Sequence, residues 1–197
     1  MVKIGVLGLQ GAISEHVKAL ESQEDVEAVV VKYPEELEGL DGLVLPGGES
    51  TAMRKLMDPY QFVEAIKAFG QKGKPIFGTC AGLILLAKTI KGQDDAHLAL
   101  MDTVAERNAF GRQRESFEAT IEVKGIADDF EAVFIRAPYI EQVGDDVDVL
   151  ATYNDRIVAC QDGPFLASAF HPELTEDYRM HAYFVNLVKE RAKHTFA

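Results

Sequence analysis

The pentapeptide Gly78-Thr79-Cys80-Ala81-Gly82 constrains the fold of this chain more than any other stretch. It joins Pro75-Ile76-Phe77, an apolar segment typical of a strand, to residues 83–87, an apolar segment typical of a helix. The G-x-C-x-G pattern is the thiol version of a nucleophile elbow, a sharp turn from strand to helix. Such a turn strains its central residue and leaves no room for side chains two positions away, so glycine belongs at both flanks. The sequence therefore predicts an α/β fold with Cys80 at a helix N-terminus, where the thiolate is favoured.

A histidine and a glutamate follow a second apolar segment. His171-Pro172-Glu173 comes directly after the apolar run 165–170, in which we expect a strand at 166–170. Residues i and i+2 of an extended segment point to the same side, and proline ends the strand. We therefore expect His171 to act as general base toward Cys80, and Glu173 to orient the imidazole ring. Separately, the two motifs are also compatible with a buried turn cysteine and a strand-end histidine, but together they indicate a catalytic triad.

A glycine-rich loop at residues 46–51 reads Pro-Gly-Gly-Glu-Ser-Thr and follows the predicted strand 42–45. Consecutive glycines allow backbone N–H groups to approach a ligand closely. The lysine of a phosphate-binding P-loop is absent, which disfavours a nucleotide. We interpret the loop as half of an oxyanion hole, in which the N–H of Gly47 or Gly48 works with the N–H of Ala81; the alternative is a simple turn.

The glycines of the N-terminal segment Gly5-Val6-Leu7-Gly8-Leu9-Gln10-Gly11-Ala12 do not have the spacing of a dinucleotide-binding loop. The strand expected at 26–32 has Glu27 at its start, and no acidic residue at its end to contact a ribose. We therefore reject NAD or FAD and expect no cofactor. Cysteine and histidine show no metal-ligand spacing, so we expect no metal site either. What remains is a first parallel strand at 3–7, whose C-terminal loop lines the ligand crevice.

Length and composition set the remaining bounds. A chain of 197 residues with 47% hydrophobic residues is expected to form one domain, 1–197, that buries about 70% of its unfolded surface. No apolar run approaches the roughly 18 residues that span a bilayer, and no signal peptide is recognisable, so we expect a cytoplasmic protein with no membrane partner. Of the two cysteines, Cys160 is expected to be a buried apolar filler. The net charge of -12 argues against nucleic acid as a partner.

Strands and helices alternate in the first half of the chain, which predicts a parallel sheet covered by helices on both sides. The second half is expected to add antiparallel strands, because its short apolar segments are joined by turn signals. The expected strands are 3–7, 26–32, 43–45, 76–77, 121–123, 133–135, 147–151, 157–160 and 166–170, and the expected helices are 13–20, a helix from about Ala52 capped by Ser50 or Thr51, 62–69, 83–87 and 176–193.

Six segments carry a family resemblance. The chain resembles the class I, triad-type glutamine amidotransferases and, over nearly its whole length, the glutaminase subunits of pyridoxal 5'-phosphate synthase. The elbow and His-Pro-Glu occur in other amidotransferases too, whereas residues 107–113 and 135–138 point to this branch. Tyr139 occupies a position where relatives often have histidine. This difference affects none of the three expected triad residues. The segments are Gly8-Leu9-Gln10-Gly11-Ala12, Leu45-Pro46-Gly47-Gly48-Glu49-Ser50-Thr51, Phe77-Gly78-Thr79-Cys80-Ala81-Gly82, Glu106-Arg107-Asn108-Ala109-Phe110-Gly111-Arg112-Gln113, Ile135-Arg136-Ala137-Pro138 and Phe170-His171-Pro172-Glu173-Leu174.

The resemblance implies a three-layer sandwich and hydrolysis of L-glutamine to L-glutamate and ammonia. The ammonia passes, within a hetero-oligomer, to a synthase subunit that builds the vitamin B6 cofactor from a pentose phosphate and a triose phosphate. A guanidinium such as that of Arg107 suits the α-carboxylate of free glutamine; the alternative for each arginine is a solvated surface charge. The resemblance assigns Cys80, His171 and Glu173 to the triad, Gly47, Gly48 and Glu49 to the surroundings of glutamine, Arg107, Ile135 and Arg136 to the substrate pocket, and Gln10 to the partner-facing rim. In the mechanism that we expect, the N–H groups of Gly48 and Ala81 form the oxyanion hole.

Two other functions stay open on the sequence. The chain could serve a different amidotransferase complex, in which the chemistry is the same and the ammonia acceptor differs. It could also be a non-enzymatic thiol sensor or chaperone of related architecture, in which Cys80 is oxidised instead of acylated. A sensor does not require a histidine and a glutamate at the end of a strand, so the His-Pro-Glu motif favours the enzyme.

Overall fold

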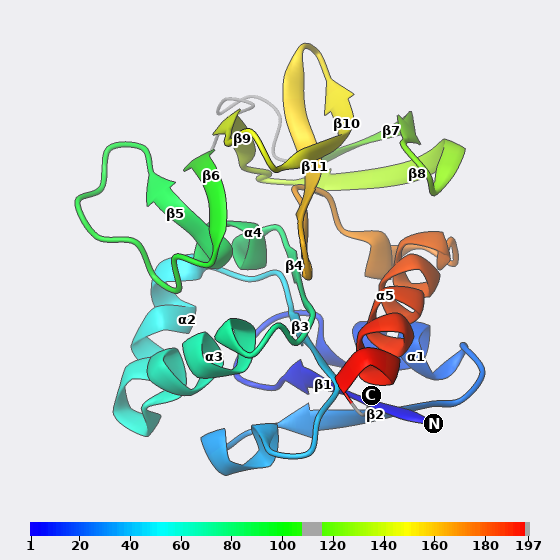
Figure 1. The fold of residues 1–197 in the computed structure, drawn as a ribbon. Helices are drawn as coiled ribbons and strands as arrows, with labels where there is room; N and C mark the ends of the chain where they lie inside the picture. The colour runs from blue at the N-terminus through cyan, green and yellow to red at the C-terminus, as the bar shows by residue number, and fades with distance from the viewer. Residues whose placement is uncertain (108–115, 196–197) are drawn as a thin grey trace.

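The computed structural model describes residues 1–107 and 116–195, with a sheet at its centre (Figure 1). Within the described chain this is a 10-stranded sheet of order β2-β1-β3-β4-β12-β11-β9-β6-β5, in which β10 pairs with β11; β7 and β8 form a 2-stranded sheet. The strands are β1 (Val2–Leu7), β2 (Val26–Val31), β3 (Gly42–Leu45), β4 (Ile76–Thr79), β5 (Ala87–Ile90), β6 (Met101–Glu106), β7 (Ser116–Val123), β8 (Ala127–Ile135), β9 (Tyr139–Val143), β10 (Asp148–Tyr153), β11 (Arg156–Asp162) and β12 (Phe165–Ser168). The helices are α1 (Ile13–Glu21), α2 (Ser50–Met57), α3 (Phe62–Gln71), α4 (Ala81–Leu86) and α5 (Arg179–Thr195), with 3-10 turns η1 (Pro34–Leu37), η2 (Asp58–Tyr60) and η3 (Pro172–Leu174).

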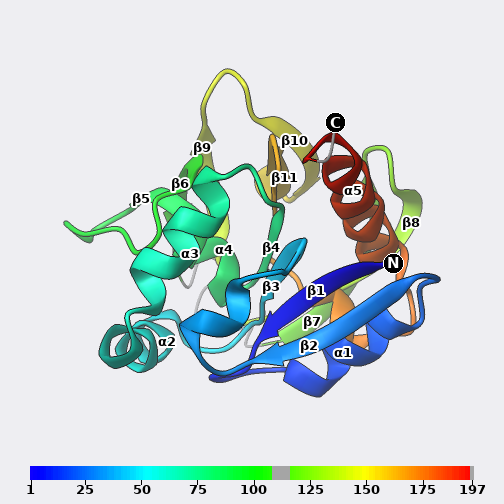
Figure 2. The same ribbon diagram turned by 60° about the horizontal axis from the view of Figure 1, so that its bottom comes forward.

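The parallel part of the sheet is built mainly by the first half of the chain. β1 pairs in parallel with β2 and β3, β3 with β4, and β4 with β12. β3, β4 and β12 are buried along their whole length, as expected where helices cover both faces of a parallel sheet. α1 and α5 lie together on one face, and α2, α3 and α4 lie on the other (Figures 1 and 2). The predicted fold, a mostly parallel sheet between two helical layers, is confirmed.

The second half of the chain adds the antiparallel strands that were expected. β11 pairs antiparallel with β10, β12 and β9, and β9 pairs antiparallel with β6. The hairpin between β10 and β11 turns at Asn154 and Asp155, whose φ angles are 49° and 61°. Both angles lie in the left-handed region that asparagine and aspartate tolerate best, so this turn signal is correct.

Several element ends differ from the prediction, and β5, β6 and β9 are not predicted at all. The helix after the elbow ends at Leu86, one residue early, because β5 begins at Ala87. The strand expected over 166–170 ends at Ser168, whose hydroxyl donates to the carbonyl of Phe170. The last helix begins at Arg179 instead of residue 176.

Aromatic rings fasten the hairpin of β7 and β8 to the segment that leads to the predicted histidine. Phe134 of β8 stacks on Phe117 of β7 with ring centroids 4.7 Å apart. The same ring meets Phe170 edge-on at 5.7 Å, and Phe130 lies 5.5 Å from Phe170. Such pairs stabilise a packing beyond the apolar area that they bury. The hairpin is therefore held beside residues 169–173.

Cys160 lies in the core of the sheet on β11 and is fully buried. Burial, together with the charge of Asp162, raises the pKa of its thiol to about 12. This cysteine is an inert apolar filler, as predicted. Among the described helices, none has the length and apolar character that crossing a bilayer requires.

Candidate active site

Cys80 occupies a strained turn between β4 and α4. Its φ of 52° and ψ of -104° lie outside the regions that an ordinary side chain adopts. A Cβ placed on Gly78 would lie 2.5 Å from the carbonyl of Gly82, and one on Gly82 would lie 2.4 Å from the carbonyl oxygen of Leu45. Only glycine fits at these two positions. The backbone N–H of Cys80 donates to the carbonyl of Ser168 at 2.8 Å, which ties the turn to the end of β12.

The structure brings His171 and Glu173 to the thiol. Nδ1 of His171 lies 2.9 Å from Oε2 of Glu173, and both the imidazole ring and Cβ of Cys80 lie beside Gly47. The expected strand end is wrong, because β12 stops at Ser168 and Pro172 opens the turn η3. The turn, and not an extended segment, therefore points the imidazole and the carboxylate toward each other. The N–H of His171 donates to the carbonyl of Val133 at 2.8 Å, so β8 also holds this backbone in place.

Electrostatics in this buried group favour a protonated histidine. Burial alone would lower the pKa of His171, but hydrogen bonds with Cys80 and Glu173 and the negative charges of both outweigh it and raise the pKa to about 10. The side chain of His171 is only 10% exposed and that of Glu173 is 0% exposed, so solvent screens these interactions little. At neutral pH the ring is therefore an imidazolium between two groups that can carry negative charge.

The glycine-rich loop lies directly against this group. A Cβ on Gly47 would lie 2.3 Å from Cε1 of His171 and 3.4 Å from Cβ of Cys80. Gly11 has a φ of 96°, and a Cβ there would lie 1.6 Å from the carbonyl oxygen of Gly47. Two loops from the carboxyl ends of β1 and β3 therefore meet beside the thiol, and the close approach of their backbones requires glycine.

Gln10 supports the same loop. A Cβ on Gly48 would lie 2.8 Å from Oε1 of Gln10, and that oxygen accepts a hydrogen bond of 2.9 Å from the N–H of Glu49. Gln10 is half-buried. It therefore lies at the rim of the site and holds the backbone of the loop in place.

Glu49 and Arg107 form a polar pair next to the loop. Nη2 of Arg107 donates to Oε1 of Glu49 at 3.0 Å and to Oγ1 of Thr51 at 3.2 Å, and Nη1 donates to Oε1 of Gln93 at 3.3 Å. Burial would raise the pKa of Glu49, but hydrogen bonds from Ala52 and Thr51 and the charge of Arg107 lower it. Two of the charged side chains predicted to bind the substrate, Glu49 and Arg107, are therefore already engaged with each other.

The helix cap beside this pair differs from the prediction. The side chain of Glu49 accepts a hydrogen bond of 2.6 Å from the N–H of Ala52, so Glu49 is the N-cap of α2. Ser50 and Thr51 lie inside the first turn of the helix, because α2 begins at Ser50. A carboxylate at this position also meets the positive end of the helix dipole.

The end of β8 closes the site from the other side. The carbonyl oxygen of Ile135 lies 3.8 Å from Sγ of Cys80, and the Ile135 residue is 39% exposed. Arg136 follows with a φ of 45°, a strained angle for a residue with a side chain. Predicted residues from the ends of β3, β4 and β8 and from η3 are thus brought together, and Ala81 lies next to Cys80 as the first residue of α4.

Some predicted features fall outside this group. Asn108-Ala109-Phe110-Gly111-Arg112-Gln113, part of the motif that favoured one amidotransferase branch, lies outside the described residues. Tyr139 donates a hydrogen bond to Glu106, and the guanidinium of Arg156 lies 4.7 Å from its ring centroid, so local contacts fix this side chain. Within residues 1–107 and 116–195, no group of cysteine, histidine and carboxylate side chains is arranged to hold a metal ion.

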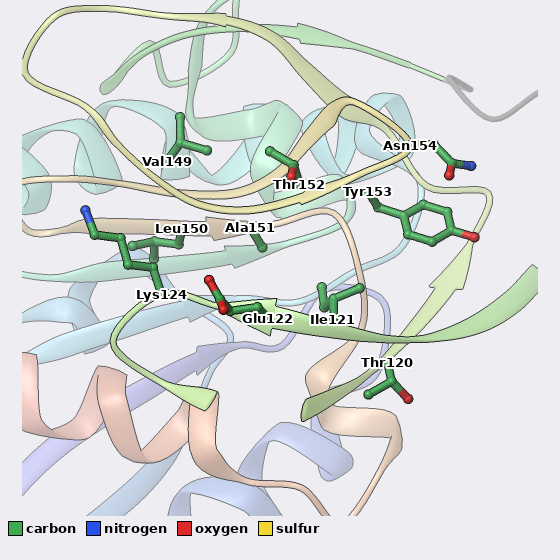
Figure 3. A pocket seen from close by; sticks show the side chains of 10 residues that line it. All are labelled: Thr120, Ile121, Glu122, Lys124, Val149, Leu150, Ala151, Thr152, Tyr153 and Asn154. Carbon is green, nitrogen blue, oxygen red and sulfur yellow. The ribbon is translucent and has the colours of Figure 1, made fainter. Parts of the chain in front are cut away.

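An open groove of about 490 Å³ lies between β7 and β10 (Figure 3). None of the ten residues that line it is a predicted site residue. They are Thr120, Ile121, Glu122, Lys124, Val149, Leu150, Ala151, Thr152, Tyr153 and Asn154.

Sequence reasoning missed two buried histidines behind Glu173. His16 on α1 and His181 on α5 are both fully buried, and Nε2 of His16 lies 3.7 Å from Oε1 of Glu173. The available signal was positional. His16 falls between Ile13 and Leu20 on the inward face of the first predicted helix, where a polar residue needs a buried partner.

Comparison with known proteins places the chain among amidotransferases. Residues 6–190 match the model of the SNO glutamine amidotransferase family. The pyridoxal 5'-phosphate synthase subunit PdxT of Anoxybacillus flavithermus is 65% identical over 190 residues, which cover 96% of this chain and 98% of that protein. The PdxT of Geobacillus kaustophilus is 66% identical over 189 residues, covering 96% of each. A crystal structure described as a glutamine amidotransferase has a TM-score of 0.88 and 47% identity, covering 94% of this chain and 98% of the other.

Proposed function

The chain belongs to the SNO glutamine amidotransferase family, and from this premise we infer that it is the glutaminase subunit of a pyridoxal 5'-phosphate synthase. It hydrolyses L-glutamine to L-glutamate and ammonia, and the ammonia passes to a separate synthase subunit. Relatives with 65% and 66% identity over nearly the whole chain carry this subunit's name. The structural observation that carries the proposal is the buried hydrogen bond of His171 with Glu173, beside Cys80 at a strained elbow.

In the mechanism that we propose, Cys80 is the nucleophile. Its proton is proposed to lie on His171 before the attack, because the raised pKa of that ring keeps it an imidazolium at neutral pH. The sulfur attacks the side-chain amide carbon of glutamine, and the carbonyl oxygen becomes an oxyanion. His171 then protonates the departing nitrogen as ammonia leaves, and a thioester remains on the sulfur. Water, deprotonated by the same ring, cleaves the thioester and releases glutamate. Glu173 orients the ring and stabilises the imidazolium.

The oxyanion hole is proposed at the N–H groups of Ala81 and of Gly48 or Gly47. Ala81 follows the nucleophile at the start of α4, where backbone N–H groups are unpaired. The loop at Gly47 is supported by its close approach to Cys80 and His171. An N–H aimed at the developing charge typically contributes about 3 to 4 kcal/mol.

Glu49, Arg107, Ile135 and Arg136 are proposed to bind the substrate. Free glutamine is a zwitterion, so its α-carboxylate suits Arg107 and its ammonium suits Glu49. The ion pair that these residues form with each other must then open when the substrate enters. Because the pair is 34% and 55% exposed, this exchange is inexpensive.

The remaining proposals concern the setting of the site. Residues 1–197 act as one amidotransferase domain, which is supported by the single core that runs along the main sheet. Gln10 lies on the rim that faces the synthase subunit. We place the protein in the cytoplasm, which is supported by the two free cysteines Cys80 and Cys160, since reducing compartments keep thiols free.

The test is ammonia release from glutamine, measured with and without added synthase subunit. We expect turnover that rises when the synthase is present. Equal rates in both cases would contradict the role of the partner, and no ammonia in either would contradict the glutaminase.

Acivicin, a glutamine analogue, identifies the nucleophile in the same preparation. Stoichiometric labelling is expected in wild type and in Cys160→Ala, and no labelling in Cys80→Ala. Labelling that survives in Cys80→Ala would refute the assignment, and oxidation of Cys80 by peroxide without any acivicin labelling would support a thiol sensor.

A further inference from the structure

Behind Glu173 the structure holds a pair of buried histidines that the glutaminase mechanism does not use. Nδ1 of His16 lies 2.9 Å from Nε2 of His181, and Nε2 of His16 lies 3.3 Å from Oγ1 of Thr79 and 3.7 Å from Oε1 of Glu173. These residues come from α1, α5, β4 and η3. The contacts therefore continue from Cys80 through His171 and Glu173 to His16 and His181.

The carboxylate of Glu173 is only half satisfied. Its Oε2 faces His171, while its Oε1 has no hydrogen bond within residues 1–107 and 116–195, and the side chain is 0% exposed. A buried carboxylate oxygen without a donor is costly. The distance of 3.7 Å from Nε2 of His16 to Oε1 of Glu173 is longer than a hydrogen bond. Hydrogen bonds in active sites often shorten when the substrate is bound.

Both histidines are neutral at physiological pH. Burial lowers the pKa of His181 to about 3. Burial, followed by the charges of His181 and His171, lowers the pKa of His16 well below its usual value. A neutral imidazole carries one N–H and one lone pair, so the pair has two possible proton placements.

The two placements differ in free energy. If the Nε2–H of His181 donates to Nδ1 of His16, then His16 carries its proton on Nε2, which faces Glu173. In the opposite placement, a lone pair of His16 faces the carboxylate, and Nδ1–H of His181 is buried where the described residues offer no acceptor. Repulsion between the His16 lone pair and the carboxylate is unfavourable, and so is a buried N–H without an acceptor. The first placement is therefore the stable one.

We propose that His16 is a positioning residue of the triad, whose Nε2–H holds Oε1 of Glu173 so that Oε2 stays aimed at His171, and that His181 fixes the tautomer of His16 in which this N–H exists. The kinetic consequences depend on the proposed glutaminase function, whereas the tautomer of His16 does not. Oγ1 of Thr79, 3.3 Å from Nε2 of His16, shares the same N–H.

The first test removes the Nε2–H of His16 but keeps a side chain of similar volume. His16→Phe is expected to lower kcat with the synthase present about 10-fold and to leave KM unchanged, an effect typical of partners that orient an active-site ligand. His16→Gln keeps an N–H at the position of Nε2 and is expected to restore most of kcat. Leu20→Ala, a buried apolar residue on the same helix, is the control for lost packing.

The pH profile separates positioning from packing. The titratable groups that face one another here are Cys80, His171 and Glu173, with His16 from α1, His181 from α5 and the ring of Tyr178, which precedes α5. Glu173 helps to raise the pKa of His171, so a misdirected carboxylate lets it fall. In His16→Phe the alkaline limb of kcat is expected to move to lower pH, while in Leu20→Ala it is expected to stay in place.

A double-mutant cycle tests the role of His181. His181→Phe removes the donor that sets the tautomer, so it is expected to lower kcat when His16 is present and to have little effect on kcat in a His16→Gln background. Equal losses in both backgrounds would overturn the proposed role of His181.

¹⁵N NMR of the wild-type chain provides a readout without catalysis. It is expected to show His16 protonated at Nε2, and a proton at Nδ1 would overturn the proposal even if every variant failed to fold. An unshifted alkaline limb in folded His16→Phe would also overturn it. Wild-type protein that releases no ammonia with the synthase would instead contradict the proposed function, and the NMR result would still decide the tautomer.

Discussion

The two sides of the candidate active site differ in how they meet water. On the nucleophile side, the side chains of His171 and Glu173 are 10% and 0% exposed; on the substrate side, those of Arg107 and Glu49 are 34% and 55% exposed. The same chemistry, a cation against a carboxylate, is present in both. Buried charges interact strongly and resist rearrangement, whereas exposed pairs are screened and contribute about 1 kcal/mol or less. The buried side is therefore suited to holding a fixed geometry, and the exposed side to exchanging partners.

The loops that separate the two sides explain why they can lie so close. Gly11 and Gly47 touch backbone to backbone, and Gly47 lies against His171. Glu49, two residues further on, already caps an exposed helix end. Residues 47–49 thus lead from the buried nucleophile side to the exposed substrate side.

Removing the nucleophile is the strongest test of the comparison. Cys80→Ala is expected to lower glutamine turnover in the complex by at least about 10⁴-fold, because the thioester cannot form. Binding to the synthase and the melting temperature are expected to stay close to wild type, since only one sulfur is lost. Normal ammonia release by this variant would show that the buried side is not where the chemistry occurs.

The pH dependence of the free energy of unfolding tests whether the histidines on the buried side have the charge states that burial predicts. The pKa of His181 is about 3 in the folded chain, below the usual 6.5, so the unfolded chain binds more protons between these values. The contribution of neutral His181 to the free energy of unfolding is fully present above about pH 6.5. It is lost as the pH falls toward 3, and the loss is on the order of a few kcal/mol. Urea unfolding from about pH 4 to about pH 8 should show a shallower acid loss in His181→Phe.

His171 contributes with the opposite sign. Its pKa rises from 6.5 to about 10 on folding, so its stabilisation is complete below about pH 6.5 and is lost as the pH rises through 10. His171→Gln serves as the matched variant, because it should remove the alkaline dependence and leave the acid one. Identical acid slopes in wild type and His181→Phe would contradict the assignment of a buried neutral ring.

The smallest effect is expected on the exposed side. Arg107→Ala should raise KM for glutamine about 10- to 100-fold and change kcat little, because it removes binding that the ground state and the transition state share. Arg179→Ala is the matched control, since Arg179 is 46% exposed and pairs with Asp129 and Asp177. A loss of kcat as large as that of a triad variant would remove the distinction between the two sides.

Local pattern was enough for the elbow and the parallel strands. The glycines at 78 and 82, the apolar flanks and the alternation of strand and helix all act over a few residues, and each prediction agrees with the structure. Predictions of element ends failed where a single hydrogen bond, which the pattern of residue types does not reveal, decided the outcome. The strand expected through residue 170 stops at Ser168, and the cap expected at Ser50 or Thr51 belongs to Glu49. β5, β6 and β9 are short or partly polar, so their pairing partners define them more than their own composition does.

The sequence by itself determined the α/β class, the family and the identity of the three residues that meet at the thiol, because these follow from short motifs. Only the tertiary structure showed that Arg107 lies on Glu49, 58 residues away, and that His16 meets His181, 165 residues away. The physical reason is that a hydrogen bond depends on distance and direction in space, and no periodicity along the chain encodes the packing of α1 against α5. His16 and His181, which we propose to position the triad, can therefore be recognised only in the folded structure, where α1 and α5 lie together.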